Sequence, residues 1–128
     1  MKNAPHLTLG AAGEEAAVKH LKSLGYRIRH RNWRYNHQEL DIIAESKDFT
    51  IIVEVKSRRQ TDYEKERFGT PAVAISKEKR QKLRGAAALY RTVEQAKKPL
   101  RFDVIEVSFT PGTDELVVES IHHMQDAF

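Results

Sequence analysis

The most constraining feature of this sequence is a short run that is apolar on both faces of a strand and yet carries two charges. It reads Ile51-Ile52-Val53-Glu54-Val55-Lys56. Alternate residues of a strand face opposite ways, and both sets contain aliphatic residues, so the run is expected inside a sheet. Glu54 and Lys56 then lie on one face, where taking a charge out of water costs free energy unless a partner or a metal compensates it. By itself, the run fits an ordinary Glu-Lys pair as well as it fits a metal site.

A second carboxylate is expected beside this strand. Asp41 lies within Glu39-Leu40-Asp41-Ile42-Ile43, and aspartate is rare inside an aliphatic strand unless it has a partner. The turn Ser46-Lys47-Asp48 folds the two strands together and places Asp41 across from Glu54. Two adjacent carboxylates repel unless a proton or a cation lies between them. A hard cation such as Mg²⁺ suits this oxygen-rich pair, and Lys56 is placed to orient a water.

A third acidic side chain is expected to reach the site from a helix. Thr8 can cap a helix that runs to about Ser23, and Gly25 can end it. Glu14 lies on the inward stripe of this helix, together with Ala17, Val18 and Leu21. It therefore either reaches the site or stops at its rim.

The remaining segments predict a single α/β domain that spans residues 1–128. Ser76 is expected to cap a helix from Lys77 to about Ala96, with Leu83, Ala86, Ala87, Tyr90 and Val93 buried. The strands are expected at 26–33, 39–44, 49–57, 101–109 and 115–122, which gives the order αβββαββ. The long helix makes a right-handed crossover between the third and fourth strands, so these two pair in parallel. The prediction is a mixed five-stranded sheet flanked by helices, with His122 and His123 at the surface.

Composition favours a basic globular protein. Hydrophobic residues make up 40% of the 128 residues and charged residues 31%, there is no cysteine, and the net charge is +4. Thiolate metal sites and disulfides are thereby excluded. The first ten residues lack the apolar core of a secretory signal, and no run is long enough to span a bilayer. We expect a cytoplasmic protein without a membrane partner, attracted to polyanions.

Together these residues match a known pattern. Asp41, twelve residues and then Glu54-Val55-Lys56 resemble the PD-(D/E)XK motif of restriction-endonuclease-like nucleases, and with Gly13-Glu14 the arrangement is similar to archaeal Holliday-junction resolvases. The closer resemblance, over roughly residues 8 to 107, is to the YraN family of uncharacterised bacterial proteins. The matching segments are Gly13-Glu14, Asn32-Trp33-Arg34, Gln38-Glu39-Leu40-Asp41, Val53-Glu54-Val55-Lys56-Ser57-Arg58, Phe68-Gly69-Thr70-Pro71, Lys79 and Arg101-Phe102-Asp103. Gln38 departs from the pattern, which usually has glycine there.

The resemblance implies a restriction-endonuclease-like fold and a role for each site residue. Asp41 and Glu54 would bind Mg²⁺ or Mn²⁺, with the Val55 carbonyl as a third ligand and Glu14 completing the site directly or through water. Lys56 would serve the attacking water, and Glu39 is a weaker candidate. The implied activity is a metal-dependent endonuclease that leaves a 5′-phosphate and a 3′-hydroxyl.

DNA, branched or damaged, is the expected substrate. Recognition would rest on shape and backbone, because a chain of this length leaves no room for a large specificity domain, and a homodimer is one arrangement that achieves this. The expected nucleic-acid contacts are Arg31, Arg34, Arg58, Arg59, Lys79 and Arg80. Trp33 is either a base stacker or, more often for such a residue, part of the core. Two alternatives stay open: a non-catalytic nucleic-acid-binding module with the same fold, and a protein-interaction domain with solvated basic faces.

Overall fold

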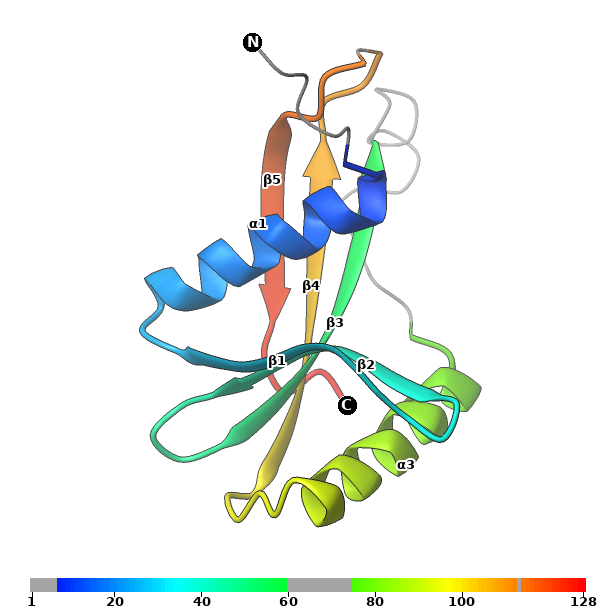
Figure 1. Ribbon diagram of the computed structural model, residues 1–128. Coiled ribbons are helices and arrows are strands. Elements are labelled where there is room, and N and C mark those ends of the chain that lie inside the picture. The colour runs from blue at the N-terminus through cyan, green and yellow to red at the C-terminus, as the bar shows by residue number, and fades with distance from the viewer. Residues whose placement is uncertain (1–6, 60–74, 113) are drawn as a thin grey trace, which may run out of the picture.

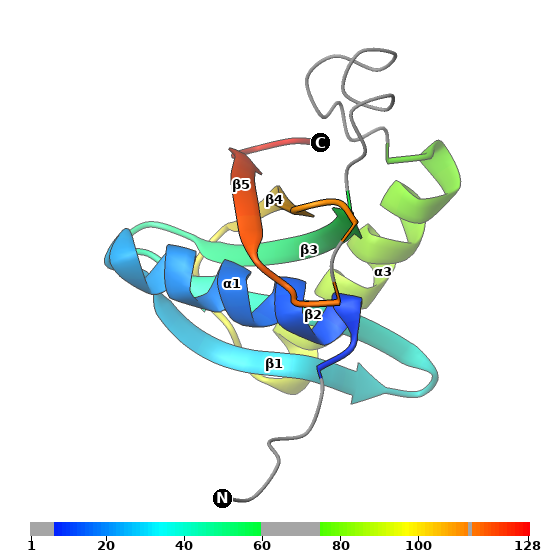
Figure 2. The same cartoon turned by 90° about the horizontal axis from the view of Figure 1, so that it is seen from above.

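A computed structural model describes residues 7–59, 75–112 and 114–128 of the chain. A five-stranded sheet forms its centre, and helix α1 crosses the strands on one side (Figures 1 and 2). The family segment Phe68-Gly69-Thr70-Pro71 lies outside the described residues. Within them, no helix is long and apolar enough to cross a membrane.

The order of the elements confirms the predicted αβββαββ fold. They are α1 (Leu9–Ser23), β1 (Arg27–Tyr35), β2 (Gln38–Glu45), β3 (Thr50–Arg59), α3 (Lys77–Val93), β4 (Leu100–Phe109) and β5 (Val118–Met124). The strands lie in the sheet in chain order. Strands β3 and β4 pair in parallel, whereas every other neighbouring pair is antiparallel. The predicted crossover through the long helix is therefore present.

The helix ends follow from local capping chemistry. Thr8 Oγ1 accepts a hydrogen bond from Ala11 N at 3.1 Å, and Ser76 Oγ accepts one from Lys79 N at 3.1 Å. After α1, Gly25 takes the left-handed conformation with φ +85°. The prediction that Val93 belongs to the buried stripe is wrong: α3 ends at this residue, and 37% of its surface is exposed.

Two apolar cores cover the two faces of the sheet. On one face α1 packs through Ala17, Val18 and Leu21 onto Ile51, Val53, Ile105 and Val107. On the other face α3 packs through Leu83, Ala86, Ala87 and Tyr90 onto Ile43, Ile52 and Val104. The two-residue alternation of β3 thus serves both cores, as an interior strand requires.

Helix α1 meets β3 in backbone-to-side-chain contact at Gly13. A Cβ atom added there would overlap Ser57 Oγ and lie 2.8 Å from Ser57 Cβ. We expect Gly13→Ala to lower the free energy of unfolding by about 1 to 3 kcal/mol, because the helix must move off the strand. Urea unfolding measures this directly.

Gly10 provides the matched control on the same helix, since a Cβ there would meet nothing within 4 Å. Gly10→Ala should leave the stability equal or higher. Ser57→Gly should restore most of the stability that Gly13→Ala loses. Equal stabilities for Gly10→Ala and Gly13→Ala would show that α1 does not rest on Ser57.

Candidate active site

Asp41 lies where strands β2 and β3 separate. Their pairing runs from Glu45 opposite Thr50 to Ile42 opposite Val53 and ends there. At the next position Asp41 Oδ2 accepts a hydrogen bond from Val55 N at 2.9 Å. The carboxylate therefore takes the place of a strand carbonyl along the opened edge of β3. In an extended strand the N–H and C=O of one residue point to the same side, so the Val55 carbonyl also faces Asp41.

A break in the alternation of β2 explains why this side chain points sideways. Ile42 belongs to the core under α1, whereas Leu40 belongs to the core under α3. In a regular strand these two residues would share a face. Between them the strand therefore reverses which face of the sheet its alternate side chains point to. Asp41 lies at this reversal and is directed into neither core.

Glu54 lies on the α3 face of β3 with only 7% of its surface exposed. Burial, then the charge of Asp41 and a hydrogen bond between the two carboxyl groups, together raise the pKa of its carboxyl to about 7. Lys79 opposes this shift, because its Nζ lies 3.4 Å from Glu54 Oε2. The Glu54 carboxyl therefore holds its proton up to about neutral pH, beside the carboxyl group of Asp41.

These groups fit a hard divalent cation. Once Glu54 loses its proton, its oxygens and those of Asp41 are available to a cation, and oxygen is the ligand that Mg²⁺ and Mn²⁺ prefer. Asp41, Glu54 and the Val55 carbonyl could hold such an ion. Among the residues that the structure describes, no three acidic or histidine side chains converge closely enough to hold one ion between them. The remaining ligand positions would therefore belong to water or substrate.

Glu14 approaches from helix α1. Its side chain is 13% exposed, and its Oε1 accepts a hydrogen bond from Asn32 Nδ2 at 2.9 Å. Arg31 lies 3.6 Å from the same oxygen and 2.8 Å from Glu15 Oε1. Glu14 is thus fixed by β1, the neighbour of β2, rather than by a direct contact with Asp41 or Glu54.

Lys56 follows Glu54 on the same face of β3 and is exposed. It pairs in register with Glu106 of β4, which is buried. Burial raises the pKa of the Glu106 carboxyl, and Arg58, whose guanidinium lies 2.9 Å away, partly offsets this rise. A buried carboxylate therefore lies beside two of the basic side chains of β3, Lys56 and Arg58.

The six residues expected to contact nucleic acid differ in whether their side chains already have a partner within the protein. Arg31, Arg58 and Lys79 pair with the carboxylates already described. Arg59 donates to the carbonyl of Thr110, whereas Arg34, 75% exposed, pairs with Glu39 at 3.3 Å. Arg80 is exposed, and its guanidinium lies 6.0 Å from the ring centre of Phe128. The structure thus brings Lys79 to Glu54, a contact that the sequence did not indicate.

The two aromatic residues of β1 have different environments. Trp33 is buried, donates from Nε1 to Glu94 Oε2 at 3.1 Å, and is a core residue. Tyr35 stacks on it at 6.1 Å between ring centres and is 43% exposed. The turn that follows has positive φ at Asn36 and His37 and not at Gln38, so the turn needs no glycine at position 38.

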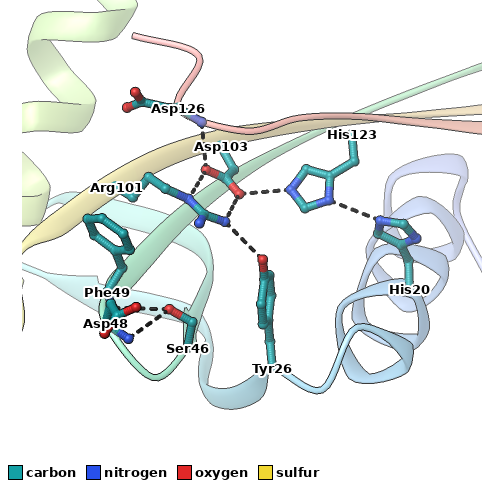
Figure 3. A network of polar contacts seen from close by, with 9 residues as sticks. All are labelled: His20, Tyr26, Ser46, Asp48, Phe49, Arg101, Asp103, His123 and Asp126. Atoms are coloured by element: carbon teal, nitrogen blue, oxygen red, sulfur yellow. Dashed lines mark hydrogen bonds and ion pairs between the residues drawn. The ribbon is translucent and has the colours of Figure 1, made fainter.

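A second polar network lies on the α1 face of the sheet, and nothing in the sequence indicated it (Figure 3). Asp103 is fully buried and accepts two hydrogen bonds from Arg101, at 2.9 and 2.8 Å. His123 Nε2 lies 2.8 Å from Asp103, and its Nδ1 lies 3.0 Å from His20 Nε2. Burial, and then the charge of His123, lower the pKa of His20. The prediction that His123 is a surface residue is wrong, because on this edge strand its face is covered by the end of α1.

Comparison with known proteins places this chain among relatives of unknown function. The model of a family described as "Uncharacterised protein family UPF0102" matches residues 13–107. A UPF0102 protein of Bacteroides fragilis is 42% identical over 125 residues, which cover 98% of this chain and 95% of the relative. One from Nocardia farcinica is 44% identical over 105 residues, covering 81% and 79%. One from Thermodesulfovibrio yellowstonii is 35% identical over 122 residues, covering 95% and 96%.

Proposed function

Because the chain belongs to the uncharacterised protein family UPF0102, its function must be inferred from the site, and we propose that it is a Mg²⁺- or Mn²⁺-dependent nuclease. It hydrolyses phosphodiester bonds in DNA, and branched or damaged DNA is the proposed substrate. One observation supports this most strongly: Asp41 and the buried Glu54 meet at an opened strand edge, and the pKa of Glu54 is raised to about 7. Perturbed carboxyl pairs of this kind are concentrated at functional sites.

Each residue has a distinct part in the proposed reaction. Asp41, Glu54 and the Val55 carbonyl would hold the ion, and Glu14 would orient a water bound to it. The ion, when bound, supplies a water of lowered pKa and neutralises charge on the phosphate. Lys56 lies on the Glu54 face, where its ammonium group can hold the attacking water or a phosphate oxygen. Lys79 lies 3.4 Å from Glu54 and can turn to the phosphate once an ion occupies the carboxylates.

The surface of the molecule supports a nucleic-acid partner. The net charge is +4, and Arg34 and Arg80 extend into solvent from the tip of β1 and the start of α3. Tyr35, exposed beside Arg34, offers a ring on which an unpaired base can stack. Such contacts recognise backbone and unstacked bases rather than a sequence, which favours branched DNA. A homodimer would present two such surfaces.

A non-catalytic nucleic-acid-binding module is the second candidate. Two observations favour it. Glu14, Glu54 and Arg58 already form ion pairs within the protein. Among the described residues, no third acidic or histidine side chain lies close enough to bind the same ion directly. Calorimetric titration with Mn²⁺ separates the candidates. A nuclease site binds the ion and the binding weakens below pH 7, where Glu54 holds its proton. A protein that binds DNA but no Mn²⁺ is the non-catalytic module.

The decisive experiment is a cleavage screen over single-stranded, duplex, flap and four-way DNA. We expect Mn²⁺- or Mg²⁺-dependent cleavage, abolished by EDTA, with branched substrates cut faster than plain duplex. DNA binding measured with Ca²⁺ in place of Mg²⁺ should weaken steeply as salt rises. Cleavage that persists in both the Glu54→Gln and the Lys56→Ala variants comes from a contaminant. If no substrate is cut or bound at low salt, the protein is an interaction domain instead.

A further inference from the structure

Asn32 has an unusual backbone for a strand residue. Its φ is +50°, the left-handed conformation, in the middle of β1. The strand changes faces around it: Arg31 reaches Glu15 on α1, whereas Trp33 belongs to the core under α3. The left-handed conformation is sterically unfavourable for most L-amino acids. Asparagine is among the few side chains other than glycine that adopt this conformation readily.

The position of Asn32 in the sheet connects it to the candidate site. Arg31 pairs with Ile42 and Trp33 with Leu40, so Asn32 lies opposite Asp41 on the neighbouring strand. Both strands therefore exchange their inward and outward faces at paired positions, β1 at Asn32 and β2 at Asp41. Backbone strain of this kind persists where the surroundings hold it in place, and it is concentrated at functional sites.

The side chain of Asn32 is aimed at Glu14. Nδ2 donates to Glu14 Oε1 at 2.9 Å, while Arg31 lies 3.6 Å from the same oxygen. Asn32 thus joins the carboxylate of α1 to the strand position that faces Asp41. Glu14 comes from a helix, and this hydrogen bond fixes its carboxylate relative to the strands.

We propose that Asn32 is a positioning residue that holds the Glu14 carboxylate over the metal site, an inference that rests on the proposed function. Two demands meet at this position. The backbone requires a residue that tolerates positive φ, and Glu14 requires a neutral donor. Glycine meets only the first demand, and aspartate would repel Glu14. Lysine and glutamine carry donors but resist the left-handed conformation. Asparagine meets both.

The test distinguishes the effect of losing the amide hydrogen bond from the effect of straining the backbone. Asn32→Gly keeps the left-handed conformation and removes the amide, so the variant should fold with a Tm at or above that of the wild type. Mn²⁺ affinity is measured by calorimetry for four proteins: wild type, Asn32→Gly, Glu14→Gln and the double variant. We expect Asn32→Gly to weaken Mn²⁺ binding about tenfold, as the loss of an outer-shell partner does. Adding Asn32→Gly to Glu14→Gln should then cause no further loss.

Each result decides the question. A tenfold loss that disappears in the Glu14→Gln background supports positioning through Glu14. An equal loss in both backgrounds, or no loss in the wild-type background, overturns it while leaving the metal site intact. If the wild type binds no Mn²⁺, the proposed function itself fails. Asn32→Ala serves as the strained control, because alanine loses the donor and resists the backbone conformation, so it should lower the Tm as well.

Discussion

The Glu54→Gln variant is expected to lose metal-dependent cleavage and yet to be more stable than the wild type at pH 8. Glutamine has the shape of the protonated acid and, like it, can donate to Asp41, but it offers the ion no charge. Loss of a metal ligand should reduce the cleavage rate about a thousandfold or more, which corresponds to about 4 kcal/mol of transition-state stabilisation. Mn²⁺ should then raise the Tm of the wild type and leave that of the variant unchanged.

The gain in stability follows from the direction of the pKa shift. Folding raises the pKa of Glu54 from 4.5 to about 7, so between these values the folded state holds a proton that the unfolded state has released. The stability of the wild type therefore falls as pH rises from 4.5 to 7 and stays low above. Glu54→Gln removes this loss. Its free energy of unfolding should therefore exceed that of the wild type by about 1 to 3 kcal/mol at pH 8 and by almost nothing at pH 4.5.

Urea unfolding at a series of pH values measures this difference. Asp48→Asn is the matched control, because it also removes one negative charge but from an exposed turn, and it should change neither stability nor cleavage. A Glu54→Gln variant that is less stable than the wild type at pH 8 would show that the two carboxyl groups do not repel. Full cleavage activity in this variant would remove Glu54 from the site.

The Asp103→Ala variant is expected to be the most destabilised of the single substitutions considered. Asp103 is fully buried and neutralises Arg101, whose side chain is only 13% exposed. Burial alone would raise the pKa of Asp103, but hydrogen bonds from His123, Arg101 and the amide of Asp126 lower it. Removing one partner of a buried ion pair leaves the other charge uncompensated and costs about 3 to 5 kcal/mol.

The measurement is again urea unfolding, with Asp126→Asn as the control. The side chain of Asp126 is exposed and its φ is +50°, which asparagine tolerates, so its stability should stay within about 0.5 kcal/mol of the wild type. Mn²⁺ affinity of the folded Asp103→Ala protein should be unchanged, because the network lies on the α1 face of the sheet whereas Glu54 lies on the α3 face. A loss of under 1 kcal/mol would show that water satisfies Arg101 in its absence.

The sequence was sufficient for the parts of the site that depend on local geometry. Asp41 and Glu54 are joined by one tight turn, so the hairpin register alone brings them together. It was not sufficient for Lys79, because its contact with Glu54 depends on how α3 lies against the sheet. The role of Asn32 could not be predicted either, since nothing in the residue order reveals a left-handed backbone. His123 was misplaced because alternation separates the faces of an edge strand without showing which face is covered.

The strands lie in the sheet in the same order as in the chain, and this has a consequence for the folding pathway. The β2–β3 hairpin needs only a short loop closure, whereas β4 can pair with β3 only after the whole crossover has been placed. Asp41 and Glu54 are therefore expected to meet early in folding, while water still screens their charges. We expect the two helices to bring Glu14 and Lys79 to the hairpin later. The repulsion between the carboxylates should then speed unfolding more than it slows folding, which stopped-flow kinetics of Glu54→Gln would measure.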